Sequence, residues 1–185
     1  TGVSAQFSIP QGITTDGANL YVADSGSGRI RRIVIATGAV TTIAGAGSGG
    51  GTTCPGTVTT GCLDGIGQQA TFVGPNDITY NNGYLYISEY TGSRVRRMDL
   101  STGQVITIAG DGSASGSADG NGTSATFINV TGGAIIGNDL YVADFNGNKI
   151  RKINLTSPYS VSTVAGSSVG YADGPASTAK FYGPD

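Results

Sequence analysis

The chain has 185 residues, of which 32 are glycine and only 12% are charged, and its formal net charge is −2. Glycine, serine, threonine and valine form helices poorly, so their abundance excludes a helical bundle. The sequence contains no histidine, which excludes His-ligated zinc sites, Ser-His-Asp triads and histidine general bases. The slightly acidic charge argues against nucleic acid as a partner, and no run of about 18 apolar residues is available to span a membrane.

From the N-terminus, short apolar segments between turn residues predict strands at about 12–15, 19–23, 29–35 and 39–44. The breaks between these segments are Asp16-Gly17, Gly26-Ser27-Gly28 and Thr37-Gly38, and all three are typical of tight turns. Short breaks join antiparallel neighbours, so the first unit is predicted to be a four-stranded antiparallel sheet.

This unit recurs along the chain, and the repeat is the main signal of the sequence. LYVAD at 20–24 returns as LYISE at 85–89 and LYVAD at 140–144. RIRRI at 29–33 returns at 94–98 and 149–153, TIAG at 42–45 returns at 107–110 and 163–166, and LDG at 63–65 returns as ADG at 118–120 and 172–174. Residues 1–185 are therefore one repeat region, with units at about 10–45, 75–110 and 130–166, loops at 46–74 and 111–129, and a tail at 167–185 that leads to a next unit.

Four antiparallel strands in a unit of about 55 residues match the blade of a β-propeller, in which sheets pack face to face around an axis. Burial of both faces explains why LYVAD is nearly continuous in apolar residues instead of strictly alternating. The predicted fold class is therefore all-β, a β-propeller with three four-stranded blades in this chain.

The repeated segments resemble NHL repeats of the bacterial secreted kind, with LYVAD followed by RIRRI, TIAG, ADG and then A-x-F-x-x-P. The resemblance covers essentially the whole chain and three repeats. It implies a six-bladed β-propeller, of which this chain would supply half, that serves as a binding or scaffold module. Related propellers of peptide-amidating lyases and lactonase-like enzymes rely on histidines, which this sequence does not contain.

The two cysteines, Cys54 and Cys62, lie in a Gly/Thr-rich stretch between the first two units. A disulfide that closes this loop would stabilise it by roughly 2–3 kcal/mol and would predict an oxidising, extracellular compartment. Two free thiols, or half of a metal site, are the alternatives. Sequons at Asn121, Asn129 and Asn154 fit a secreted, glycosylated chain.

Nine of the ten basic residues fall in the three RIRRI-like segments, five to eight residues after an acid that ends the preceding strand. Antiparallel neighbours at this spacing place a carboxylate beside a guanidinium group, which predicts one structural ion-pair site per blade. The alternative is a basic ring that binds nucleic acid or an anionic glycan. The predicted pairs are Asp24 with Arg29 and Arg31, Glu89 with Arg94 and Arg96, and Asp144 with Lys149 and Arg151.

Aromatic residues divide into those that repeat and those that do not. The repeated ones are expected to plug the contacts between adjacent blades, with ligand stacking as the alternative; they are Phe7, Phe72, Phe127 and Phe181. The remaining ones, Tyr80, Tyr84, Tyr90 and Phe145, are the better candidates for a specific surface.

Acidic residues in the loops raise the possibility of Ca²⁺, since loops rich in Asp, Asn and Gly often supply its oxygen ligands. The spacing matches no EF-hand pattern, and Asp-Gly is by itself a common turn, so no metal or cofactor is predicted. The candidate calcium ligands are Asp64, Asp119 and Asp173, with Asp111 and Asn121.

No nucleophile motif or base with an orienting partner is present, so the sequence predicts no enzyme. The expected function is a non-catalytic extracellular structural or interaction module that assembles through its blade faces. It would form a closed propeller by dimerisation, a head-to-tail filament, or part of a longer array, with residues 167–185 crossing to a neighbouring unit. The alternative is a ligand-binding or hydrolytic, lactonase-like propeller that uses an axial site lined by Asp and Asn.

Overall fold

The computed structural model describes residues 2–46, 63–113 and 116–185. The predicted disulfide between Cys54 and Cys62 lies outside these residues. Within them the chain forms three antiparallel sheets and four short 3₁₀ turns. No helix in the described ranges is long and apolar enough to cross a membrane.

Each sheet is one blade, and its four main strands follow one another in space as they do in sequence. Blade 1 consists of β1 (Pro10–Thr15), β2 (Asn19–Asp24), β3 (Arg29–Val34) and β4 (Ala39–Ala44). Blade 2 consists of β6 (Pro75–Asn81), β7 (Tyr84–Glu89), β8 (Arg94–Asp99) and β9 (Gln104–Ala109). Blade 3 consists of β11 (Val130–Ile136), β12 (Asp139–Asp144), β13 (Lys149–Asn154) and β14 (Ser160–Ala165).

Blades 2 and 3 carry a fifth strand that the sequence did not predict. It comes from the inter-blade segments, where β5 (Gly65–Ile66) pairs with β9 and β10 (Gly120–Asn121) pairs with β14. The assignment of these segments as loops was therefore wrong at these two points. Two residues are too short for a strand pattern, and they pair because the outermost strand of a blade otherwise presents unpaired backbone groups.

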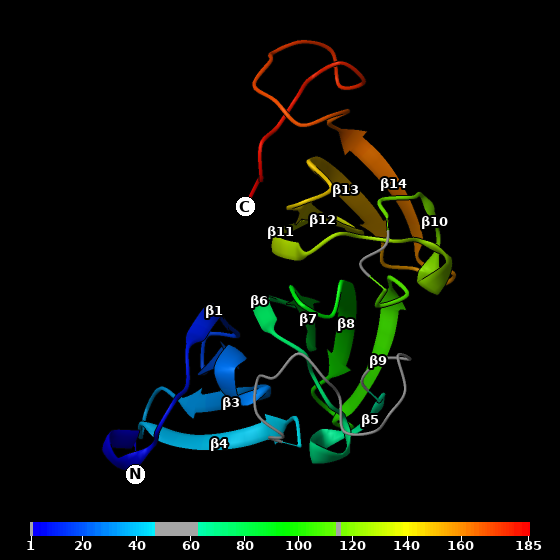
Figure 1. Cartoon of the computed structure of the whole chain (residues 1–185). Helices are drawn as coiled ribbons and strands as arrows, with labels where there is room; N and C mark the ends of the chain where they lie inside the picture. Colours follow the sequence, from blue (N-terminus) through cyan, green and yellow to red (C-terminus); the bar gives the residue numbers. More distant parts are fainter. Residues whose placement is uncertain (1, 47–62, 114–115) are drawn as a thin grey trace.

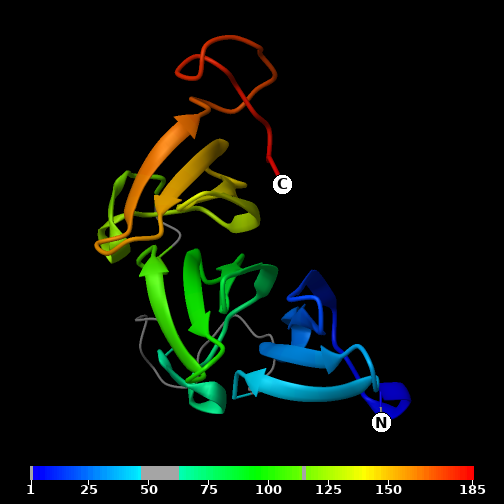
Figure 2. The same cartoon turned by 180° about the vertical axis from the view of Figure 1, so that it is seen from behind.

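The blades stand side by side along an arc, with β1, β6 and β11 on its inner side (Figures 1 and 2). The central inner strand, β6, contacts both β1 and β11. This arrangement confirms the predicted all-β propeller blades.

The glycine that ends each TIAG segment is fixed by a close approach of the backbone. Gly45, Gly110 and Gly166 have φ values of 99°, 91° and 102°, which residues with a side chain rarely adopt. A Cβ atom on any of the three would overlap the carbonyl of the residue that precedes the RIRRI-like strand. Glycine is therefore required directly after the last main strand of each blade, where the chain leaves that blade.

The core consists of two clusters, each of which lies between neighbouring blades. Phe72 packs in the first cluster with Ile30 of blade 1 and Leu85 of blade 2, and Phe127 packs in the second with residues of blades 2 and 3. Phe72 is 3% exposed and Phe127 is fully buried, whereas Phe7, which no blade covers from the other side, is 36% exposed. The structure thus places two of the four repeated phenylalanines between blades.

The tail, residues 167–185, stays on its own third blade at both ends. The Gly166 N–H donates to the carbonyl of Ala176 at 3.1 Å, and the Gly183 N–H donates to Oδ1 of Asn148 at 3.1 Å. The expectation that the whole segment crosses to another unit is therefore wrong. Its middle part forms a loop that extends beyond β14 (Figure 1).

The buried phenylalanines predict a graded loss of stability. Phe127→Ala should lower the free energy of unfolding by about 3–5 kcal/mol, because the substitution leaves a cavity between two blades. Phe7→Ala should cost clearly less, since its ring already contacts solvent. Urea unfolding of both variants measures the difference, and equal losses would contradict the inter-blade role of Phe127.

Candidate functional site

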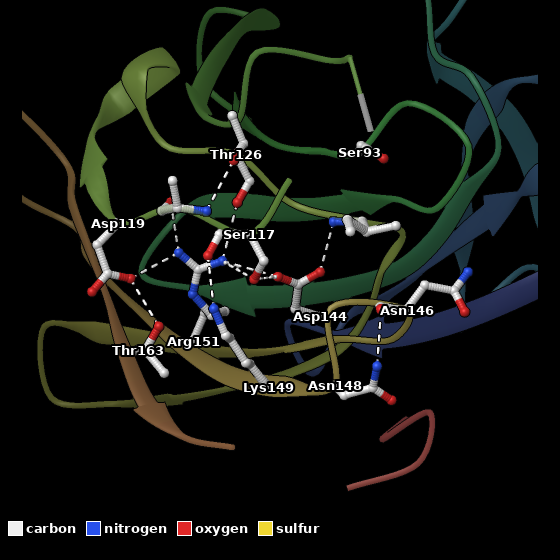
Figure 3. Close-up of polar contacts among 12 residues, drawn as sticks. Ser93, Ser117, Asp119, Thr126, Asp144, Asn146, Asn148, Lys149, Arg151 and Thr163 are labelled. Carbon is white, nitrogen blue, oxygen red and sulfur yellow. Dashed lines mark hydrogen bonds and ion pairs between the residues drawn. The ribbon is translucent and has the colours of Figure 1, made fainter. Parts of the chain in front are cut away.

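The most elaborate polar site of the molecule surrounds Arg151 in blade 3 (Figure 3). The fully buried guanidinium group donates from Nη1 to Asp144 and from Nη2 to Asp119, each at 2.9 Å. It also donates to the main-chain carbonyls of Ala118 at 2.8 Å and Thr126 at 3.0 Å. Nη1 also donates to the Ser117 hydroxyl at 3.0 Å, so one arginine holds an acid of its own blade and four groups of the segment that precedes the blade.

Blade 2 repeats this cluster around Arg96. Its Nη1 lies 2.7 Å from Oε1 of Glu89, and its Nη2 lies 2.8 Å from Oδ1 of Asp64. The carbonyls of Leu63 and Thr71 accept at 3.0 Å from the same two nitrogens. The two clusters therefore have the same four oxygen acceptors at equivalent positions of the repeat.

An aromatic ring covers the guanidinium group in every blade. Arg96 lies 5.2 Å from the ring centre of Phe72, and Arg151 lies 5.0 Å from that of Phe127. Such cation–π contacts are strongest where water is excluded. The phenylalanine and the ion pair are therefore parts of one site. The same ring that packs against apolar side chains also covers the guanidinium group.

Blade 1 has an incomplete version of the site. Arg31 contacts Asp24 and the carbonyl of Gln6, each at 3.3 Å, and lies 5.2 Å from the ring of Phe7. Within the described residues, no second acid reaches Arg31.

The first basic position of each segment behaves differently from the second. Arg29, Arg94 and Lys149 stand directly opposite the acids in the strand register. Arg94 lies 3.5 Å from Oε2 of Glu89, but Lys149 donates to the carbonyl of Ser117, and among the described residues Arg29 forms no ion pair. The predicted ion pairs are thus brought together for the second basic position in all three blades and for the first position in blade 2 alone.

Burial shapes the electrostatics of these sites. Complete burial raises the pKa of Glu89, and the positive charges of Arg96 and Arg94 offset part of this rise. Burial also lowers the pKa of Arg94, although Glu89 opposes that shift. The pKa of Asp119 is lowered, because hydrogen bonds from Thr163 and Arg151 outweigh its partial desolvation.

Three of the candidate loop acids, Asp64, Asp119 and Asp111, form hydrogen bonds or ion pairs with protein groups. Asp64 and Asp119 bind the arginines and also accept from the hydroxyl groups of Thr107 at 3.0 Å and Thr163 at 2.9 Å. Asp111 binds Ser113 in its own turn. In the ranges that the structure describes, no group of three or more Asp, Glu, His or Cys residues lies close enough to hold a metal ion.

The sequence suggested the four non-repeating aromatic residues for a specific surface, but three of them lie in contacts between blades and Tyr84 covers an arginine of its own blade. Tyr80 stacks on Tyr21 at 6.4 Å, and Tyr90 packs edge-on against Phe145 at 5.9 Å. Tyr84 covers Arg97 at 4.8 Å.

The three sequons differ in how free their amide groups are. Asn129 is half-buried and donates to the Tyr90 carbonyl at 2.9 Å, and Asn154 donates to Asp139 at 3.0 Å. Asn121 is exposed, so it is the sequon whose side chain is most accessible for modification.

The arginine sites predict a large and blade-specific effect of substitution. Arg151→Ala should lower the free energy of unfolding by about 3–5 kcal/mol, because it leaves the buried Asp144 without its counter-charge. Arg31→Ala is the matched control and should cost less, since its contacts are longer and fewer. Urea titration of the two variants tests this, and a loss for Arg31→Ala as large as that for Arg151→Ala would refute it.

The lowered pKa of Asp119 predicts a pH-dependent effect. A carboxyl group whose pKa is lower in the folded state stabilises the protein above its unfolded pKa, and this contribution is lost as the pH falls. Asp119→Asn should therefore destabilise the protein at pH 7 and have little effect near pH 2. Unfolding free energies at both pH values measure it, and a pH-independent difference would contradict the prediction.

Comparison with known proteins identifies the type of repeat. No family model matches the chain. NHL repeat-containing protein 2 of Bos taurus is 32% identical over 181 residues and that of Homo sapiens is 30% identical, and each alignment covers 92% of this chain. The chain spans about a quarter of the length of these relatives, 24% in both cases.

Solved structures agree with the fold at lower identity. A protein of unknown function from Bacteroides thetaiotaomicron matches with a TM-score of 0.68 at 22% identity, over 95% of this chain and 40% of its own. An auxiliary nutrient binding protein from the same organism matches with a TM-score of 0.67 at 20% identity, over 90% and 39%. Virginiamycin B lyase from Staphylococcus aureus matches with a TM-score of 0.51 at 16% identity, over 83% and 40%. The three repeats of this chain are therefore NHL-type repeats, and each folds as one blade of a β-propeller.

Proposed function

We propose that the protein is a non-catalytic interaction module that assembles through the faces of its two end blades. The proposal rests on apolar side chains that are exposed on the outer faces of blades 1 and 3. The side chains at the equivalent positions of the repeat are buried where two blades pack together. A secreted location is part of the same proposal and rests on the cysteine pair and the sequons.

The outer face of blade 1 shows this exposure directly. Ile13 and Ile78 occupy equivalent positions in β1 and β6, and they are 59% and 2% exposed. Ile78 is covered because blade 1 packs against it, whereas no described residue covers Ile13 in the same way. Phe7 differs from Phe72 in the same sense.

The opposite end presents a second apolar face. Val164 of β14 is 38% exposed, whereas Ile108, its equivalent in β9, is fully buried against blade 3. Tyr171 and Tyr182 of the tail stack on each other at 5.6 Å and are largely exposed. Exposed apolar patches of this kind mark interaction surfaces. The two end faces differ from each other, which favours contact between unlike faces of neighbouring molecules.

A ligand-binding or hydrolytic propeller remains the second candidate, with an axial site lined by Asp and Asn. The shared fold with a virginiamycin B lyase and an auxiliary nutrient binding protein supports it. On the inner strands, however, the carboxylate of Asp77 accepts from the Gly133 N–H at 2.9 Å and so ties β6 to β11. This contact engages the acid in structure, which favours the interaction module.

The molar mass in solution tests the proposal. Light scattering should give a concentration-dependent mass above the 18.5 kDa of one chain. Ile13→Lys places a charge on the outer face of blade 1, where the side chain is already exposed, and should lower the assembled fraction at least about tenfold without loss of stability. Ala36→Lys, in the exposed turn after β3, is the matched control and should assemble like the unmodified chain. A mass of 18.5 kDa at all concentrations would overturn the proposal.

A further inference from the structure

A cavity opens between blades 1 and 2, at the end of the sheets that carries the turns after β1, β6 and β8. Its volume is about 420 Å³, which is within the range of small-molecule sites. Both blades that form it belong to this chain, and most of its lining comes from the two turns of blade 2. The main lining side chains are Tyr21, Tyr80, Asn82, Tyr84, Asp99 and Ser101.

A departure from the repeat keeps this space open. Gly83 lies in the turn between β6 and β7, and a Cβ atom on it would meet no described atom within 4 Å. The same turn position in blade 3 is Asn138, whose side-chain amide donates to the hydroxyl of Thr156 at 2.8 Å. This hydrogen bond joins the two turns of blade 3, whereas the space between Gly83 and Ser101 in blade 2 stays free. The cavity is therefore a feature of blade 2.

Aromatic rings form the apolar walls of the cavity. Tyr80 stacks on Tyr21 with ring centres 6.4 Å apart and an angle of 12° between the ring planes. The Tyr21 hydroxyl donates to Oδ2 of Asp16 at 2.8 Å, and Tyr84 is fixed by its contact with Arg97 at 4.8 Å. Tyr80 and Tyr84 are only half-buried. The cavity thus offers ring surface that the fold holds in place.

Polar groups without protein partners lie beside these rings. Oδ1 of Asp99 accepts from the N–H of Ser101 at 2.8 Å and from its hydroxyl at 2.6 Å. Within the described ranges, no hydrogen bond reaches Oδ2 of Asp99, the hydroxyl groups of Tyr80 and Tyr84, or the exposed amide of Asn82. A ligand therefore finds hydrogen-bond donors and acceptors together with apolar surface.

The charges around the cavity favour a neutral ligand. Asp16 accepts four hydrogen bonds from protein groups, so both of its oxygens are engaged. Hydrogen bonds from Ser101 lower the pKa of Asp99, and the positive charge of Arg97 acts in the same direction. Asp99 is thus ionised with a cation nearby, which reduces its attraction for a second cation.

We propose that this cavity binds a neutral carbohydrate, a mono- or disaccharide. Oδ2 of Asp99 accepts from sugar hydroxyl groups, and the amide of Asn82 both donates and accepts. The rings of Tyr80 and Tyr84 contact the C–H faces of the sugar. A sugar ring needs this combination, because it carries hydroxyl groups along its edge and apolar C–H groups on its faces. The inference goes beyond the proposed function, since no lining residue belongs to the outer face of blade 1 or 3.

The test is an NMR titration of the full chain with Ile13→Lys, a substitution outside the cavity that keeps the chain dispersed. The probes are four neutral disaccharides: cellobiose, maltose, lactose and diacetylchitobiose. At least one of them, at millimolar concentration, should shift the amide signals of Asn82, Gly83 and Ser101 and leave those of blade 3 unchanged. Tetramethylammonium should not shift them. If no sugar moves these signals, or the cation moves them as strongly, the carbohydrate site is refuted.

Asp99→Asn tests the carboxylate without disturbing the turn. The equivalent residue of blade 3 is Asn154, whose Oδ1 accepts from the Thr156 N–H at 3.0 Å, so asparagine already serves at this position of the repeat. The variant should bind the sugar at least about tenfold more weakly, because it loses a hydrogen bond to a charged acceptor. Asp111→Asn is the matched control, since Asp111 accepts from the N–H and hydroxyl of Ser113 in a similar turn outside the cavity. Equal affinities of the two variants would overturn the proposal.

Asn82→Gly provides a second variant that the fold accommodates. Blades 1 and 3 have Gly17 and Gly137 at this turn position, both with positive φ like Asn82. The substitution removes the exposed amide and should weaken sugar binding several-fold, while the signals of blade 3 stay in place. Unchanged affinity would show that the sugar lies elsewhere and would contradict the assignment of this cavity.

Discussion

In blades 2 and 3 a buried arginine, Arg96 or Arg151, fixes the connector that precedes the blade, residues 63–72 or 118–127. Burying a guanidinium group and the carboxylate of Glu89 or Asp144 is expensive, and a set of apolar side chains of similar volume could give the same stability. Apolar side chains could not, however, bind the two connector carbonyls that Arg151 satisfies. These carbonyls belong to residues on either side of β10 and its 3₁₀ turn, outside the strand pairing, where a buried carbonyl needs another partner. We infer that the arginine is used because it determines where the connector lies.

The position of the connector in turn determines how the blades stack. The arginine covers the phenylalanine of the connector, and that ring fills the space between two sheets. The connector also adds β10 to the outer edge of blade 3, directly after Asp119. One residue therefore links the edge pairing, the inter-blade core and the buried charges, so each repeat interacts mainly with its immediate neighbours, as in other repeat proteins.

The sequence predicted the parts of this structure that are local. Turn residues and the repeat period placed all twelve main strands, because both signals lie within a few residues of the feature they determine. The pairing of Asp24 with Arg31 and of Asp144 with Arg151 followed from strands joined by a tight turn. Contacts within one hairpin are thus accessible to sequence reasoning.

Contacts between distant segments were not predicted correctly. Asp119 was considered as a calcium ligand, and its pairing with Arg151, 32 residues away, was missed. The recurrence of ADG at a fixed distance before each basic segment was the available signal, but spacing alone does not show which loops fold back onto a strand. The aromatic contact of Tyr90 with Phe145 was missed for the same reason, since the two rings meet only when blades stack.

The structural unit is therefore shifted relative to the sequence repeat. A complete unit is a connector together with the blade that follows it, because the connector acid and the arginine belong to one site. In the described residues, blade 1 has the arginine without the connector acid, and the tail has the acid without an arginine. The boundary of the unit thus lies before the connector acid, after the glycine that ends the preceding blade.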